Sequence, residues 1–274
     1  MARLRARAGG YRPGDELTRG RAPTLLAPLD VKASGRRLDS DGFCEGLVLP
    51  TDVVEELLSF ALLGVCYGNS DPSCGFTYAD RRRAEAATGR TFSLATYLFT
   101  DEVEPLIRRL ANDPQLRGII AEYFGVPPVY LGRRIWWTLK TPEHLYDRQL
   151  TTSHFHYDRD DYRSVRVFFH LTAVDAQHGP HVVVRGSHRR KALVHQLSLQ
   201  KRTDGNIERY YGDDNVVTVQ GAAGTGFIED TFCFHKATRP VAGDRLMLEL
   251  GFGLQDHRRF PPPDRAAASL IPLP

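Results

Sequence analysis

The sequence is poor in cysteine, lacks a long apolar run and has no excess of charge of one sign. Its 4 cysteines form no C-x-x-C pair, so we expect reduced thiols and a cytoplasmic protein without disulfide staples. The longest apolar stretch, near residues 57–66, is about half the ~20 residues of a membrane span, so no membrane helix is expected. Basic residues number 36 and acidic residues 33, and the basic groups are scattered, which argues against nucleic acid as a partner.

The two halves of the chain have different patterns. From Thr51, apolar residues recur at helical spacing with Gly68 as the expected stop, a second helix opens at Asp101, and a third spans residues 114–124. After Pro128 the sequence changes to short runs rich in β-branched and aromatic residues, separated by glycine, aspartate and asparagine. The expected strands are 129–139, 152–157, 165–172, 181–184, 216–219, 226–232 and 245–252.

These patterns predict one mainly β domain with flanking helices. Seven or eight strands without helices between them are typical of a sandwich or barrel. We expect an irregular N-terminal segment over residues 1–50 and a helical region over 51–127 that packs outside the core. The β core would then span residues 128–257, and an irregular tail would cover 258–274.

Two of the expected strands have one apolar face and one polar face. In the last strand, Arg245, Met247 and Glu249 lie opposite a row of leucines and a phenylalanine. In the strand over 165–172, the corresponding polar face holds Arg166, Phe168 and His170. Because the polar face recurs, we expect these strands to line a polar cavity.

The segment around His156 has the residue types of a metal site. On an extended strand, His156 and Asp158 point the same way, about 6 to 7 Å apart along the chain. His235 lies 79 residues after His156, at the end of another expected strand. Two histidines and one carboxylate on one face of an octahedral metal leave three positions open, which suits non-haem Fe(II) oxygen chemistry. Arg245 begins the next strand on its polar face, where a guanidinium could hold a carboxylate beside the metal.

Two alternatives use the same segment differently. His154 shares strand parity with His156, so the pair could open a cupin-type metalloenzyme site with Asp160 as its acidic ligand. We favour the first interpretation, because the later glycine-rich histidine motif of a cupin does not occur around His235. The other alternative is a non-catalytic jelly-roll protein that binds a metal or ligand in the same pocket.

Four elements over roughly residues 133–255 together resemble the phytanoyl-CoA dioxygenase family of Fe(II)/2-oxoglutarate oxygenases. They are His156-Tyr157-Asp158, the run Gly179-Pro180-His181-Val182-Val183-Val184-Arg185-Gly186-Ser187-His188, His235 and Arg245. The resemblance implies a double-stranded β-helix, that is, a cupin-like jelly roll, with Fe(II) held by His156, Asp158 and His235. It also implies that Arg245 binds the C5 carboxylate of 2-oxoglutarate.

The resemblance further implies an enzyme that consumes O2 and 2-oxoglutarate, releases succinate and CO2, and by default hydroxylates a small molecule, often in secondary metabolism. Asp158 disfavours halogenation, since halogenases of similar architecture lack this carboxylate. Phe168 stands where the family often has a tryptophan near the cosubstrate, so other cosubstrate contacts stay open. Thr138, Arg166 and His170 are candidates from strand parity alone. The sequence favours a polar metabolite and leaves open its identity and whether desaturation, epimerisation or ring formation replaces hydroxylation.

Overall fold

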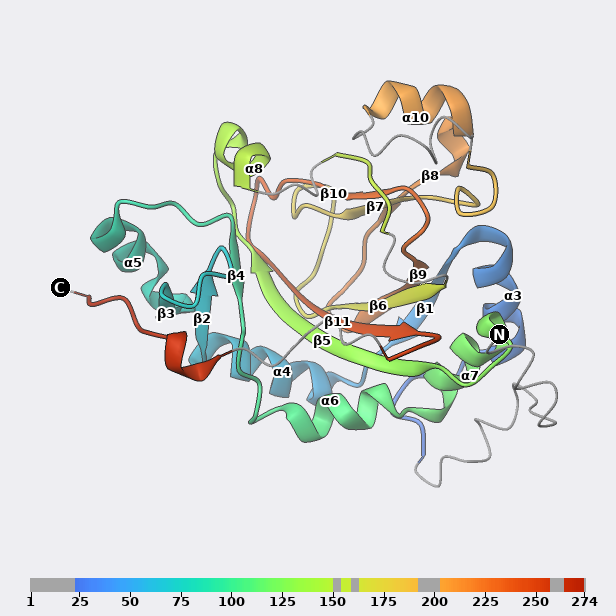
Figure 1. Ribbon diagram of the computed structural model, residues 1–274, viewed down its shortest axis with the longest axis horizontal. Coiled ribbons are helices and arrows are strands. Elements are labelled where there is room, and N and C mark those ends of the chain that lie inside the picture. Colours follow the sequence, from blue (N-terminus) through green and yellow to red (C-terminus); the bar gives the residue numbers. More distant parts are fainter. Residues whose placement is uncertain (1–22, 150–153, 159–162, 192–202, 257–263, 274) are drawn as a thin grey trace.

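The computed structural model describes residues 23–149, 154–158, 163–191, 203–256 and 264–273, and its centre is a pair of facing antiparallel sheets (Figure 1). The larger sheet has 8 strands in the order β1-β9-β6-β11-β5-β4-β2-β3, and the smaller has 3 in the order β10-β7-β8. This is the expected mainly β architecture of a jelly roll, and it does not close into a barrel over the residues described.

The long strands lie in the middle of the larger sheet. β11 pairs with β5 on one side and with β6 on the other. The strands are β1 (Phe43–Val48), β2 (Val65–Gly68), β3 (Gly75–Thr77), β4 (Leu94–Thr96), β5 (Val129–Thr138), β6 (Ser164–His170), β7 (His181–Val184), β8 (Val216–Val219), β9 (Thr225–Asp230), β10 (His235–Ala237) and β11 (Arg245–Gly253).

Helices cover the outer face of the larger sheet, and two further helices lie beside the smaller sheet (Figure 1). Along the larger sheet run α3 (Val31–Asp41), α4 (Thr51–Leu63), α6 (Glu104–Ala111) and α7 (Pro114–Phe124), and α5 (Arg81–Thr88) lies near β2 and β3. Beside the smaller sheet are α8 (Glu143–Gln149) and α10 (Asp204–Tyr211). Short 3-10 turns occur at η1 (Tyr78–Asp80), η3 (Asp213–Asn215) and η4 (Arg265–Ala267).

The ends of α7 follow from its sequence. Asp113 accepts hydrogen bonds from the backbone N–H groups of Gln115 (2.9 Å) and Leu116 (3.1 Å), which satisfies donors that a helix start leaves unpaired. Pro114 occupies the first turn, where its missing N–H costs nothing. Gly125 ends the helix at φ 71°, a left-handed conformation that glycine adopts without strain.

Strand parity sorts the side chains into two cores. The outer face of β11 packs against the helices through Leu246, Leu248, Leu250 and Phe252, while Met247 faces the second sheet. The same division holds on β6, where Phe168 faces inward. The two faces that the sequence pattern predicted for these strands are therefore confirmed.

Several expected elements differ from the structure. The segment 1–50, expected to be irregular, contains α3 and β1 among its described residues, and β1 forms the edge of the larger sheet beside β9. The expected helical region 51–127 also supplies β2, β3 and β4. The first helix ends at Leu63 instead of near Gly68, because the chain turns at Gly64 to enter β2.

Two further expectations concern short or partly described segments. Over its described residues, the expected strand 152–157 is reduced to bridge residues at Phe155 and His156, the second of which pairs with His235. In the expected irregular tail, η4 is followed by a bridge between Leu270 and Gly75. Within the described ranges, no helix is both long and apolar enough to cross a membrane.

Candidate metal and cosubstrate site

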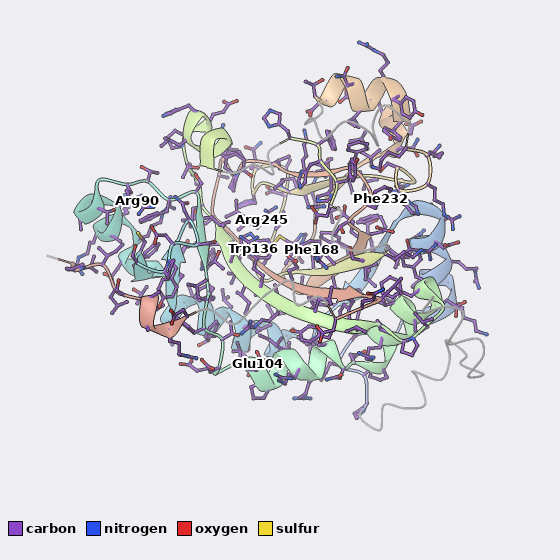
Figure 2. All side chains as sticks on the ribbon, viewed as in Figure 1. Arg90, Glu104, Trp136, Phe168, Phe232 and Arg245 are labelled. Carbon is purple, nitrogen blue, oxygen red and sulfur yellow. The ribbon has the colours of Figure 1, made fainter. Side chains whose placement is uncertain are left out.

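A cavity of about 300 Å³ opens between the two sheets. Its wall comes from β5, β6 and β11 of the larger sheet and from β7 and β10 of the smaller one. Figure 2 shows Trp136, Phe168 and Arg245 together in this central space. The polar faces that parity predicted thus line a cavity instead of facing bulk solvent.

His156, Asp158 and His235 converge at one corner of the cavity. One potential ligand atom from each lies within 4.8 Å of those of the other two. The His156 N–H donates to the His235 carbonyl (3.0 Å), the His235 N–H donates back (2.9 Å), and the Asp158 N–H donates to the Thr231 carbonyl (2.8 Å). These backbone bonds bring together side chains that are far apart in sequence.

Both imidazoles are oriented for ligation through the same nitrogen. His156 Nδ1 lies 2.8 Å from the His154 carbonyl, and His235 Nδ1 lies 3.0 Å from the Cys233 carbonyl. Because a carbonyl only accepts, each Nδ1 carries the proton and each Nε2 keeps its lone pair. Two neutral imidazoles and one carboxylate are the donor set of a facial non-haem iron site, so these residues fit a ferrous ion.

A buried serine, Ser187, fixes the backbone immediately before His235. Ser187 is fully buried, and its hydroxyl accepts the Phe234 N–H (2.8 Å) while donating to the Val184 carbonyl (2.7 Å). Gly186, at φ 68°, makes the turn that brings Ser187 there. The Gly-Ser-His run noted in the sequence therefore fixes the backbone beside His235.

Glu229 and His181 are two residues of this corner to which the sequence analysis gave no role in the site. The Glu229 carboxylate lies 2.6 Å from His181 Nε2 and 3.2 Å from His235 Nδ1. Burial raises the pKa of Glu229 to about 8 and lowers the pKa of His181 to about 3. Parity on β9 was the available signal, because Phe227 and Glu229 both lie on its inner face.

Arg245 lies in the wall of the cavity and is 2% exposed. It donates through Nη2 to the Thr138 hydroxyl (3.1 Å) and through Nη1 to the Gly179 carbonyl. Its buried Nε has no hydrogen-bond partner among the described residues. Burial lowers the pKa of Arg245 to about 10, so the side chain stays charged at neutral pH. A buried guanidinium with an unused donor fits the carboxylate of a diacid.

The other cosubstrate candidates take different places. Thr138 lines the cavity and holds Arg245, and Phe168 lines it with its ring 4.9 Å from that of Phe227. Arg166 also lines the cavity, in an ion pair with Glu249 at 3.1 Å.

His170 shares the polar face but lies outside the cavity wall that the described residues form. Its Nδ1 is 3.4 Å from the Thr225 hydroxyl. Parity therefore gave the correct face for His170 without giving access to the cavity.

The cupin alternative is not favoured by the geometry. His154 is exposed, and it lies outside the group of potential metal ligands found among the described residues. Its carbonyl orients His156, as described above. Asp160, the acidic ligand of that alternative, falls outside the described residues.

Comparisons with known proteins agree with this geometry. Residues 101–244 match the phytanoyl-CoA dioxygenase (PhyH) family. No curated protein gives a significant sequence match.

Several solved structures share the fold at low sequence identity. The non-heme alpha ketoglutarate dependent carbocyclase SnoK from nogalamycin biosynthesis has 17% identity and a TM-score of 0.55, covering 84% of this chain and 86% of its own. EctD from S. alaskensis with bound Fe has 16% identity and a TM-score of 0.54, covering 90% and 89%. HygX from Streptomyces hygroscopicus with nickel and 2-oxoglutarate bound has 17% identity and a TM-score of 0.53, covering 82% and 88%.

Proposed function

The chain belongs to the phytanoyl-CoA dioxygenase family of Fe(II)- and 2-oxoglutarate-dependent oxygenases, and from that premise we propose that it hydroxylates a small polar metabolite. In this proposal His156, Asp158 and His235 hold the iron, and Arg245 binds the distal carboxylate of 2-oxoglutarate. The observation that carries the proposal is the convergence of the three ligand atoms within 4.8 Å at the edge of a cavity that also contains Arg245.

The protein's own groups would prepare the site in two ways. The carbonyls of His154 and Cys233 hold both imidazoles with Nε2 available for the metal. Arg245, fixed by Thr138, orients the cosubstrate through a charge-assisted contact. When bound, iron and 2-oxoglutarate together supply the O2 activation needed to oxidise a C–H bond.

The inner faces of β5 and β11 divide the cavity into bands. Thr138 pairs with Arg245, Trp136 with Met247, and Arg134 with Glu249. A polar band at Arg245 is thus followed by an apolar band and then by a charged band, about 13 Å along the strand from the first. We assign the Arg245 end to the cosubstrate and the Arg134 end to the substrate.

The charged band supports a polar substrate. Arg134 lies with its guanidinium carbon 4.8 Å from the centroid of the Trp136 ring, and Glu249 pairs with Arg166. Burying charged groups beside an alkyl chain would be costly, whereas a polar metabolite can hydrogen-bond to them. The volume points the same way: a cavity of about 300 Å³ that must also hold 2-oxoglutarate has room only for a small molecule.

The direct test is succinate formation from 2-oxoglutarate by the iron-loaded protein. We expect His156→Ala and Asp158→Ala to lose metal binding and succinate formation together, because each removes one of three ligands. His178→Ala is the matched control, since His178 pairs with Asp175 (2.7 Å) away from the cavity wall formed by the described residues. Full turnover in Asp158→Ala would contradict the proposed ligand set.

The same assay separates the alternatives. A non-catalytic binding protein would bind metal and 2-oxoglutarate without forming succinate with any substrate. A cupin-type site would lose its metal in His154→Ala, a variant that we expect to keep it. Once a substrate is found, incorporation of one oxygen atom from labelled O2 distinguishes hydroxylation from epimerisation and from ring formation, the outcome that the name of SnoK implies for that protein.

A further inference from the structure

Lys191 lies inside a box of three aromatic rings. Its Nζ is 3.9 Å from the centroid of the Tyr157 ring, 4.7 Å from that of Phe232 and 3.7 Å from that of Phe234. The Tyr157 ring stands at 79° to Phe232 and at 85° to Phe234. Lys191 is 6% exposed, so its ammonium interacts with these rings largely out of water. The attraction between a cation and an aromatic face is strongest in such a desolvated setting.

The walls of this box are chain neighbours of all three candidate metal ligands. Tyr157 stands between His156 and Asp158, and Phe234 directly precedes His235. Phe232 follows Thr231, whose carbonyl accepts the Asp158 N–H at 2.8 Å. One ammonium therefore contacts both chain segments that must meet to form the metal site.

Over the described residues, these two segments share few backbone bonds. The long strands of the larger sheet are held by continuous ladders, whereas the segment with His156 meets the segment with His235 through an isolated bridge and the single bond from Asp158 to Thr231. The side chains of the box add a second connection at the same place. In a folded protein, the relative position of two such short segments depends on contacts of this kind.

We propose that Lys191 is a positioning residue for the metal centre: its ammonium holds Tyr157, Phe232 and Phe234 together and so keeps the three ligands in register. The inference rests on the proposed function, because it assumes that His156, Asp158 and His235 bind the metal. It adds a residue that touches neither metal nor substrate and acts through the backbone on either side of the ligands.

The direction in which metal affinity changes when the Lys191 ammonium is removed distinguishes a positioning role from a purely electrostatic one. A positive charge close to a cation site opposes metal binding through Coulomb repulsion. If charge were the whole effect, removing the ammonium would tighten metal binding. If the box holds the ligands in place, removing the ammonium weakens metal binding.

The experiment titrates the metal-stripped full-length protein with Mn(II) by calorimetry. Lys191→Met removes the ammonium and keeps an unbranched side chain, and we expect the Kd for Mn(II) to rise about tenfold, at the low end of what residues that orient ligands contribute. Lys191→Arg keeps a cation that stacks on aromatic rings and should stay within about threefold of the wild type. At saturating Co(II), the ligand-field spectrum should change in Lys191→Met and not in Lys191→Arg.

Lys236→Met is the matched charge control. Lys236 follows His235 in the chain, and its Nζ lies 4.7 Å from the centroid of the Phe155 ring and 2.6 Å from Asp204. Lys236→Met removes a positive charge and a single ring contact beside the same ligand but leaves the three rings around Lys191 in place, so Mn(II) binding should weaken much less than in Lys191→Met.

Two results with the Lys191 variants would overturn the inference directly. Lys191→Met could bind Mn(II) as tightly as the wild type or more tightly, or Lys191→Arg could fail to restore binding. If Lys191→Met does not fold, Phe232→Leu removes one ring and keeps an apolar side chain, and unchanged Mn(II) binding there would refute the box. A wild type that binds no Mn(II) contradicts the proposed function itself, and the role of Lys191 with it.

Discussion

Arg245→Gln removes a buried guanidinium from the cavity wall and keeps a polar side chain in its place. In the structure Thr138 and Gly179 already hold this guanidinium, so the wild-type protein need not reorganise it when a carboxylate arrives. We therefore expect its loss to appear almost entirely as weaker binding of 2-oxoglutarate. Metal binding should be unchanged, because Arg245 is outside the group of candidate ligands.

The size of the effect follows from the burial of Arg245, which is 2% exposed. Removing one partner of a buried ion pair costs roughly 3–5 kcal/mol, because the other charge is left uncompensated. At about 1.4 kcal/mol for each factor of ten, the Kd for 2-oxoglutarate should rise by roughly two to three and a half orders of magnitude. Thr138→Val removes one hydrogen bond to the guanidinium, and roughly fivefold to tenfold weaker binding is expected from its loss.

The assay is anaerobic calorimetric titration of the metal-loaded protein with 2-oxoglutarate. A second titration with 2-oxobutyrate, which lacks the distal carboxylate, identifies the group that Arg245 contacts. The wild type should strongly prefer 2-oxoglutarate, and Arg245→Gln should lose that preference. Arg90→Gln is the control: it removes the same charge from a surface ion pair with Asp71, away from the central cavity (Figure 2). It should leave the Kd values for 2-oxoglutarate and 2-oxobutyrate unchanged. An Arg245→Gln variant that binds metal normally and 2-oxoglutarate within threefold of the wild type would refute the assignment.

Two predictions concern stability. Gly226→Ala would place a Cβ 2.5 Å from the Phe168 carbonyl, so denaturant titration should show a free energy of unfolding that is lower by about 1–3 kcal/mol. Gly205→Ala is the control, because nothing lies within 4 Å of its new Cβ, and it should be neutral or stabilising. Equal effects of the two substitutions would contradict the steric argument. Burial lowers the pKa of His170 from 6.5 to about 4, so the unfolded chain binds a proton that the folded protein refuses, and stability falls as the pH drops from about 6.5 to about 4. His170→Gln should remove about 3 kcal/mol of that fall in unfolding titrations, and an unchanged pH dependence would contradict it.

Strand alternation made the central sheet predictable. On β6 and β11 each residue's face is fixed by its immediate neighbours, so the pattern could be read without tertiary information. In β1 the alternation of buried and exposed residues is interrupted, because its pairing with β9 shifts register between Glu45 and Leu47, where Gly46 has φ 102°. β2, β3 and β4 contain 4, 3 and 3 residues, too few for a periodic pattern.

The candidate site was predictable where spacing along one strand or the order of motifs carried it. His156 and Asp158 are two residues apart, and the structure brings both beside His235. The contact between His181 and Glu229 joins residues 48 positions apart, and only the facing of two sheets brings them together. His170 was placed on the correct face but not correctly in the cavity wall. Parity gives the face of a strand residue, whereas its access to the cavity depends on how neighbouring strands pack.

The two halves of the site are held in different ways. Arg245 and Thr138 stand on paired long strands, so a continuous ladder fixes the cosubstrate end. Over the described residues, the ligand corner has an isolated bridge and one further backbone bond instead, and its geometry depends on side chains such as Ser187, Glu229 and Lys191. A rigid ladder tolerates the loss of one side-chain contact better than an isolated bridge does, because its backbone bonds remain. Substitutions in the ligand corner, such as Lys191→Met, should therefore weaken metal binding even though they touch neither metal nor substrate.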